Sequence, residues 1–281
     1  MSTDTGLTDR FVTVRGLRFH VVEGGARAAP AVVFLHGITA HALTWDEEAC
    51  ALAARFHVVA IDQRGHGDSD PAPDGDYDNP ALVDDFAAIV DALDLSRFHL
   101  VGLSLGGRVA IAYAGTHPER VDRLVVVDIG PDIAPAGLAR IGTLLGSAPE
   151  RFERVEDAIA WMRAANPLYT EARLRHRVEH GLRRLADGGF TWKYDRAIRD
   201  RARPGRLRAP VDLWPLWKAI AAPTLLVRGA DSDILSDGIA QRMIDAQPRA
   251  QLAVVPGAGH TVPGDQPEAF LRLLTGFLTA R

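Results

Sequence analysis

Short apolar runs, separated by longer helical patterns, do most to restrict the fold of this chain. Most are apolar throughout, without alternation, as expected for strands buried on both faces of a sheet. Helical segments between such strands predict a mostly parallel sheet covered by helices, an α/β fold. The runs are Ala31–His36, Phe56–Ile61, Phe98–Leu103, Leu124–Val127, Thr224–Val227 and Gln251–Val255.

Polar or glycine-rich residues follow each of these runs, so the carboxyl edge of the sheet is where chemistry is expected. Two earlier runs, Phe11–Arg15 and Arg18–Glu23, are joined through Gly16-Leu17 and predict an antiparallel hairpin. Asn79-Pro80 predicts the start of a helix, and another helix is expected to begin near Asp265.

Residues 131–222 interrupt the alternation of strands and helices. No convincing strand is visible there, and helical patterns dominate, as in Val155–Ala164 and Ala172–Ala186. We interpret this segment as a helical cap, or lid, inserted after the sixth strand. The predicted core domain then comprises residues 1–130 and 223–281. The cap is more basic than acidic and contains Trp161, Trp192, Trp214 and Trp217.

Composition excludes several classes of protein and site. Apolar residues make up 47% and charged residues 24% of the 281 residues, values typical of a globular chain and not of a disordered or coiled-coil one. A net charge of −4 gives no basic footprint for nucleic acid. The single cysteine, Cys50, allows neither an internal disulfide nor a cysteine-based metal cluster.

Targeting and cofactor signals are also absent from the sequence. The first ten residues lack the apolar core of a signal peptide, and no stretch approaches the roughly 18 apolar residues of a membrane span. We therefore expect a cytoplasmic protein without a membrane partner. No His/Asp/Glu spacing of the zinc type occurs, and the chemistry inferred below requires neither metal nor other cofactor.

The sharpest chemical signal is the motif Gly102-Leu-Ser-Leu-Gly106, between a predicted strand and a predicted helix. In that context a G-x-S-x-G motif forms a tight turn that exposes the serine as a nucleophile. The N-terminus of the following helix directs its partial positive charge toward Ser104. Ser104 is therefore the candidate nucleophile.

A serine hydroxyl needs a base to accept its proton. Of the ten histidines, only His260 follows the cap segment, in the loop Pro256-Gly-Ala-Gly-His260 after the last strand. The base in turn needs a carboxylate that fixes its tautomer. Asp233 is preferred, and Asp128 and Asp231 remain alternatives, since each follows a strand at the carboxyl edge.

Acyl chemistry also needs donors for the developing oxyanion. The backbone N–H of Leu105, directly after the nucleophile, is one expected donor, and that of Ile38, in the loop His36-Gly37-Ile38-Thr39, is the other. Gly37 permits close approach of the main chain. His36 is expected to bond loop backbone.

The order Ser104, Asp233, His260, together with the motifs around His36 and Ser104, resembles the α/β-hydrolase family, in its serine esterase-like branch. The resemblance covers nearly the whole chain and includes Asp62–Ser69 and Val127–Pro131. It implies an eight-stranded, mostly parallel sheet whose second strand is antiparallel, with a helical cap after the sixth. Family members usually carry the acid in a G-x-x-D turn, whereas here Gly229-Ala-Asp-Ser-Asp233 departs from that spacing. A Ser-Asp version with the acid four residues after the glycine resembles bacterial esterase-like members, which supports Asp233. Other members place it after the sixth strand, where Asp128 lies.

The nucleophile limits the reaction. Dehalogenase-like and epoxide-hydrolase-like members of the family use aspartate at this turn, so Ser104 indicates an acyl-enzyme and a small carboxylic ester substrate. Lactone or amide hydrolysis, or carbon–carbon bond hydrolysis of a diketone, would use the same residues. A non-catalytic small-molecule sensor is the least favoured alternative, because neither nucleophile nor base is lost. The oligomeric state is not predicted.

Cap residues suggest how a substrate is held. Trp161 and Trp192 are candidates to line an apolar acyl pocket, with packing inside the cap as the alternative. Arg163, Arg173 and Arg199 are candidate clamps for a substrate carboxylate, against the ordinary alternative of a solvated face.

Overall fold

The central element is an eight-stranded sheet in the order β1-β2-β4-β3-β5-β6-β9-β10. It belongs to a computed structural model that describes residues 6–200 and 211–280. Only β2 runs against the other strands, because it pairs antiparallel with both β1 and β4 and all remaining pairs are parallel. This confirms the predicted fold class. The strands are β1 (Thr8–Val14), β2 (Leu17–Gly24), β3 (Ala31–Leu35), β4 (His57–Ile61), β5 (Phe98–Leu103), β6 (Val121–Val127), β9 (Thr224–Gly229) and β10 (Ala250–Val255).

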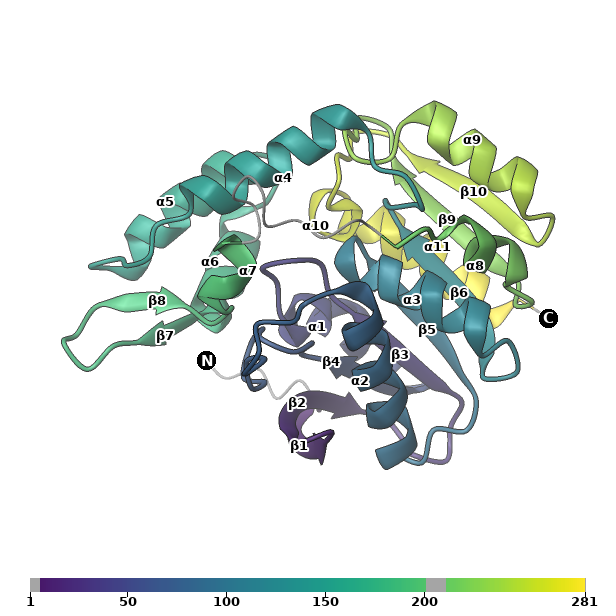
Figure 1. Cartoon of the computed structure of the whole chain (residues 1–281), viewed down its shortest axis with the longest axis horizontal. Coiled ribbons are helices and arrows are strands. Elements are labelled where there is room, and N and C mark those ends of the chain that lie inside the picture. The colour runs from purple at the N-terminus through teal and green to yellow at the C-terminus, as the bar shows by residue number, and fades with distance from the viewer. Residues whose placement is uncertain (1–5, 201–210, 281) are drawn as a thin grey trace.

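Helices cover both faces of the sheet, which explains the uninterrupted apolar runs (Figure 1). In β3, Val33 and Leu35 belong to one buried cluster and Val32 and Phe34 to the other. The first cluster includes residues of α2 (Asn79–Ala92), α3 (Leu105–Thr116), α8 (Trp214–Ala219) and α9 (Asp237–Ala246). The second includes residues of the 3₁₀ turn η1 (Ala42–Trp45), α1 (Asp46–Leu52) and α11 (Pro267–Thr279).

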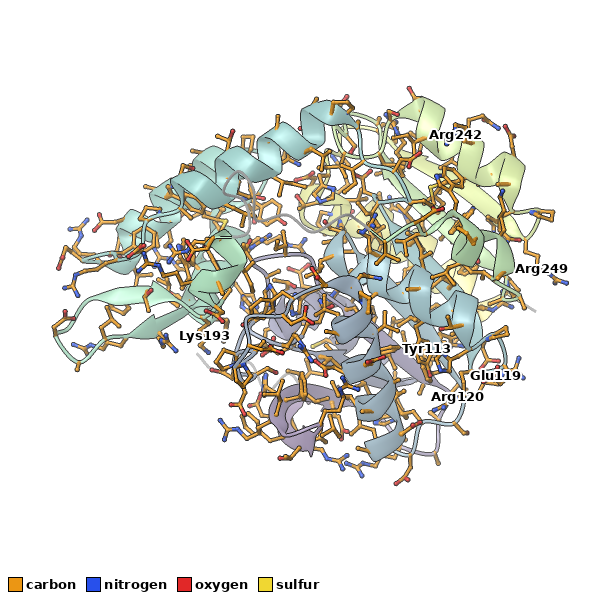
Figure 2. All side chains as sticks on the ribbon, viewed as in Figure 1. Tyr113, Glu119, Arg120, Lys193, Arg242 and Arg249 are labelled. Carbon is orange, nitrogen blue, oxygen red and sulfur yellow. The ribbon has the colours of Figure 1, made fainter. Side chains whose placement is uncertain are left out.

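Aromatic side chains fix α3, the helix after Ser104, against its neighbours. Tyr113, labelled in Figure 2, is fully buried. It packs edge-on against Phe86 of α2, with ring centroids 4.7 Å apart. It also stacks on Phe98 of β5 at 5.9 Å. Burying rings of this size contributes strongly to stability, so these contacts hold the C-terminal half of α3 firmly against the sheet and α2.

The predicted insertion lies between β6 and β9, which are neighbours in the sheet. It contains α4 (Pro135–Ser147), α5 (Val155–Ala165), α6 (Glu171–Gly181) and α7 (Arg196–Asp200), which arch over one side of the core in Figure 1. The expectation of a strand-free segment was wrong, because β7 (Leu182–Arg184) and β8 (Phe190–Trp192) form an antiparallel hairpin. Each strand has three residues, too few to show a period, and Gly188 takes the positive φ of 91° in the connecting loop.

The last part of the predicted cap packs with the core. Leu213, Trp217 and Ile220 belong to the same buried cluster as the sheet, and Trp217 donates its indole N–H to the carbonyl of Met243 at 2.8 Å. We therefore propose a division in which the cap ends before residue 211 and residues 211–222 join the core. None of the described helices is long and apolar enough to cross a membrane.

Two predicted helix starts agree closely with the structure. Asn79 is the first residue of α2, with Asp78 at the N-cap position. Near Asp265, a short helix α10 (Val262–Asp265) ends and α11 begins at Pro267. The turn between β10 and α10 carries His260.

Candidate active site

Ser104 occupies a strained turn between β5 and α3. Its φ of 53° lies in the left-handed region, which non-glycine residues seldom adopt. A Cβ at Gly102 would overlap the carbonyl of Gly106, and a Cβ at Gly106 would overlap that of Leu35. The two glycines of the motif are thus required by close backbone packing, which holds Ser104 between strand and helix.

His260 lies on the loop after β10, with its ring against Asp128. The Nδ1 atom of His260 is 2.9 Å from the Oδ2 atom of Asp128, whose side chain is completely buried at the end of β6. A carboxylate only accepts hydrogen bonds, so Nδ1 carries the proton and Nε2 is left as an acceptor. This is the tautomer that a general base requires.

The preference for Asp233 as the carboxylate partner of His260 is not supported by this geometry. Asp233 instead accepts a hydrogen bond from the Nε atom of Arg140 at 2.6 Å, and Asp231 is exposed. The loop after β9 serves Asp128 in another way. Ser232 donates its hydroxyl to Oδ2 of Asp128, and the N–H of Gly229 donates to Oδ1 at 2.9 Å. Of the three expected aspartates, Asp128 is the one in contact with His260.

Asp265 holds the loop on both sides of His260, a role that sequence reasoning missed. It accepts hydrogen bonds from the N–H of Gly259 at 2.9 Å and from the hydroxyl of Thr261 at 3.3 Å. Burial raises the pKa of Asp265, against the lowering effect of these hydrogen bonds. The sequence indicated only a helix start near this residue, and nothing in that pattern points to the histidine loop.

The loop after β3 brings Ile38 beside the nucleophile. A Cβ built on Gly37 would lie 3.4 Å from the Cβ of Ser104, so this loop runs directly against the serine. Ile38 lines the same pocket as Ser104, and Leu105 is the first residue of α3. Within residues 6–200 and 211–280, the N–H groups of Ile38 and Leu105 have no hydrogen-bond partner. Two such N–H groups at this place are compatible with an oxyanion hole, and the assignment of Ile38 and Leu105 to it stays a prediction.

His36 supports this loop from beneath. Its Nδ1 atom bonds the carbonyl of Gly37 at 2.8 Å, and its Nε2 atom accepts the N–H of Gln63 at 3.0 Å. Complete burial lowers the pKa of His36 to about 3, so the ring is neutral. The contacts match the backbone-bonding role expected for it.

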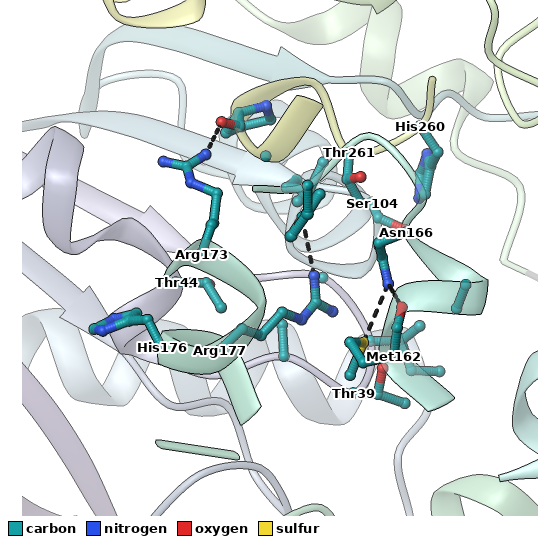
Figure 3. A pocket seen from close by; sticks show the side chains of 18 of the residues that line it. Thr39, Thr44, Ser104, Met162, Asn166, Arg173, His176, Arg177, His260 and Thr261 are labelled. Carbon is teal, nitrogen blue, oxygen red and sulfur yellow. Dashed lines mark hydrogen bonds between the residues drawn. The ribbon is translucent and has the colours of Figure 1, made fainter. Parts of the chain in front are cut away.

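A pocket with a volume of about 400 Å³ opens over Ser104 and His260 (Figure 3). The cap forms its far wall, including the predicted Trp161. Trp192 does not line this pocket. It is 4% exposed and packs inside the cap, with its ring centroid 5.4 Å from that of Trp161 and 5.0 Å from that of Phe152. The alternative of cap packing is therefore the correct one for Trp192.

Of the three candidate arginine clamps, one lines the pocket and two do not. Arg173 lines the pocket, whereas Arg163 pairs with Glu171 and Arg199 bonds the carbonyls of Ala148 and Pro149. Two further pocket arginines, Arg140 and Arg177, were missed. Their places depend on how the cap folds over the core, which local sequence does not reveal.

Helix α6 is tied to the core along one edge of the pocket. Arg173 donates to the carboxylate of Glu47 and to the carbonyl of Pro263. His176 lies 3.1 Å from Asp46 and bonds the carbonyl of Leu43 at 3.1 Å. The hydrogen bond with Asp46 raises the pKa of His176. These contacts place the cap wall relative to Ser104.

One cluster in the described chain has the spacing of a metal site, formed by His20, Asp62 and Asp68. Both ring nitrogens of His20 are already engaged, with Asp62 at 2.7 Å and Asp9 at 2.8 Å. Asp62 also accepts the N–H groups of Ala42 and Asp68. The carboxylate of Asp68 pairs with Lys193 at 2.7 Å. Since each member already has a partner, we interpret the cluster as a hydrogen-bonded support beneath the loops of the site.

Comparison with known proteins agrees with this geometry. The family model described as the alpha/beta hydrolase fold matches residues 30–267. A 2-(acetamidomethylene)succinate hydrolase of Mesorhizobium japonicum is 31% identical over 271 residues, covering 96% of this chain and 95% of the relative. An esterase of Mycobacterium tuberculosis is 33% identical over 265 residues, covering 90% of this chain and 84% of the relative.

Solved structures give the same result. The crystal structure of E-2-(acetamidomethylene)succinate hydrolase superposes with a TM-score of 0.89 at 30% identity, covering 98% of this chain and 100% of that one. An alpha/beta hydrolase from Novosphingobium aromaticivorans superposes with a TM-score of 0.86 at 30% identity, covering 97% and 98%. The sheet order, the helical insertion and these relatives lead to one conclusion. The chain belongs to the α/β-hydrolase-fold family and is a hydrolase of that fold.

Proposed function

We propose that this hydrolase cleaves a small carboxylic ester through an acyl-enzyme. The observation that carries the proposal is the pairing of His260 with the buried Asp128, in the same pocket as a serine held in a strained turn. This combination supplies a nucleophile, a base in the correct tautomer and a buried negative charge that stabilises the imidazolium.

In the proposed mechanism, the Oγ atom of Ser104 attacks the ester carbonyl carbon while its proton passes to Nε2 of His260. The carbonyl oxygen becomes an oxyanion and accepts hydrogen bonds from the N–H groups of Ile38 and Leu105. The tetrahedral intermediate then collapses, and His260 returns the proton to the departing alkoxide. Water, deprotonated by His260, hydrolyses the acyl-serine in the same way and releases the carboxylic acid.

The relatives support this reaction and also a second candidate. An esterase and the mouse sn-1-specific diacylglycerol lipase ABHD11, 31% identical over 269 residues, are named for ester substrates. The Mesorhizobium relative is named for an acetamido-bearing succinate, which favours hydrolysis of a substituted amide as the alternative. Ser104, His260 and Asp128 would serve in either reaction, because His260 can protonate the departing oxygen of an ester or the departing nitrogen of an amide.

The test is hydrolysis of p-nitrophenyl acetate, butyrate and octanoate by the wild type and by Ser104→Ala. We expect turnover in the wild type and its loss in the variant. Ser147→Ala is the matched control, because Ser147 is exposed at the end of α4. The dependence on chain length reports how much of the pocket beside Trp161 the acyl group fills.

Turnover that persists in Ser104→Ala would contradict the proposed nucleophile. Absence of turnover with all three esters in a folded wild-type protein would contradict the ester assignment. Hydrolysis of N-acyl enamides would then become the next assay, since the second candidate uses the same site.

A further inference from the structure

Almost every basic side chain in the pocket wall has a carboxylate partner. Among the described residues, Arg140 pairs with Asp233 at 2.6 Å, Arg173 with Glu47, His176 with Asp46 at 3.1 Å and His260 with Asp128 at 2.9 Å. The acidic groups in the wall, Asp46 and Glu47, both take part in these ion pairs. The remaining cation is Arg177.

Arg177 lies on α6, and its only side-chain hydrogen bond in the described chain goes to a neutral group. Its Nη1 atom donates to the hydroxyl of Tyr169 at 3.1 Å, and no carboxylate of residues 6–200 or 211–280 pairs with it. Its Nε atom is buried and has no partner there. Figure 3 shows the guanidinium within the pocket that also contains Ser104 and His260.

A buried, unpaired donor on a charged group is costly, because it has lost water without gaining an acceptor. A bound anion offsets this cost, because it places a negative charge beside the guanidinium. Nε is enclosed, so the donor that a ligand can reach is Nη2, which has no partner among the described residues. Its N–H groups suit the oxygens of a carboxylate.

We propose that the natural substrate carries a carboxylate in addition to the bond that is cleaved, and that Arg177 binds this carboxylate from the cap wall. The inference rests on the proposed function for the position of the reacting carbonyl at Ser104. It specifies the substrate class as an acidic acyl compound, such as the half-ester of a dicarboxylic acid. Arg177 acts here as a specificity residue, and Tyr169 orients its guanidinium.

The first experiment compares two substrates of almost equal size, mono-p-nitrophenyl adipate and its methyl ester. We expect the wild type to prefer the acid, and Arg177→Gln to lower kcat/KM for the acid by roughly 10- to 100-fold while changing the methyl ester little. Arg177→Lys keeps a charge but loses the fork, so its loss should be intermediate. Arg175→Gln is the matched control, because Arg175 lies on the same helix and pairs with Glu179 at the surface.

A second experiment separates this inference from the proposed ester hydrolysis. Calorimetry measures the binding of monomethyl adipate and of dimethyl adipate to the inactive Ser104→Ala protein, with and without Arg177→Gln. Tighter binding of monomethyl adipate, which keeps the carboxylate, supports Arg177 as the anion site if the preference disappears in the double variant, even if neither ester is hydrolysed.

The converse result is equally decisive. Equal binding of monomethyl adipate and dimethyl adipate to Ser104→Ala overturns the inference, even if the neutral ester is a good substrate and the proposed function stands. This comparison needs no substitution at Arg177, so misfolding of Arg177→Gln would not rescue the proposal. A preference for monomethyl adipate that survives in a folded double variant overturns Arg177 as its source.

Discussion

The carboxylate of Asp128 is satisfied from three sides. His260, the hydroxyl of Ser232 and the backbone N–H of Gly229 all donate to it, and its side chain has no exposed surface. Asp128 itself has a φ of 51°, a strained conformation that the end of β6 maintains. A carboxylate buried this deeply needs hydrogen-bond donors to stabilise its charge. The same donors fix the orientation in which the carboxylate of Asp128 faces His260.

Substitution separates Asp128 from Asp233. We expect Asp128→Ala to lower kcat by roughly 10⁴-fold, because His260 loses the group that fixes its tautomer and stabilises its charge. Asp233→Ala should remain close to the wild type, since its carboxylate bonds Arg140. The measurement is kcat and KM on the best p-nitrophenyl ester, with circular dichroism to verify folding. A large loss of kcat in Asp233→Ala alone would reverse the assignment.

Residue types and spacing could not decide between these aspartates. Both follow strands that end at the same edge of the sheet. The loop after β9, which carries Asp233, does reach the site. What it contributes there is Ser232 and the N–H of Gly229, which hold Asp128 in place. Which carboxylate meets His260 depends on a long-range approach of β6, β9 and the loop after β10, which no local pattern contains.

At the scale of the elements, the turn between β5 and α3 depends on the absence of side chains. A Cβ at Gly106 would overlap the backbone carbonyl of Leu35, which belongs to β3. Backbone in the middle of a sheet cannot move away without breaking strand pairing, here between β3 and both β4 and β5. By contrast, Gly142 of α4 has nothing within 4 Å of its Cβ position.

We therefore expect Gly106→Ala to destabilise the protein by about 2 kcal/mol or more. Gly142→Ala should be neutral or stabilising by up to about 1 kcal/mol, because alanine loses less backbone entropy in a helix. Urea unfolding of both variants measures the difference. If Gly106→Ala were as stable as Gly142→Ala, the close approach of α3 to β3 would be incorrect.

The sequence predicts the elements of the core better than those of the cap. β5 spans the residues predicted for it, since a buried strand between two sharp polar boundaries is apolar throughout. β7 and β8 were missed because three residues cannot establish a period, and α6 ends at Gly181, before the predicted Ala186. Trp192 and Arg177 illustrate the same limit within the site, because only the folding of the cap decides which side chains face Ser104.

Across the whole molecule, buried titratable groups make stability depend on pH in two opposite directions. Burial lowers the pKa of His36 to about 3 and of His41 to about 4. Both are protonated more readily when the chain is unfolded, so stability falls as the pH drops below 6.5. Burial raises the pKa of Glu48 in α1 to about 8, so the folded chain retains a proton that the unfolded chain releases above pH 4.5. That difference lowers stability as the pH rises toward 8.

These two opposite pH dependences predict that the free energy of unfolding is greatest near pH 6.5. Below that pH the two histidines outweigh Glu48, and above it the raised pKa values of Glu48, His20 and His176 all contribute to the decline. Glu48→Gln should remove up to about 1.4 kcal/mol per pH unit of the decline between pH 6.5 and 8. Urea unfolding at these two pH values measures the change, and Glu268→Gln, exposed on α11, is the control. An unchanged slope in Glu48→Gln would mean that Glu48 is ionised in the folded protein, and that the charge of Arg173 outweighs its burial.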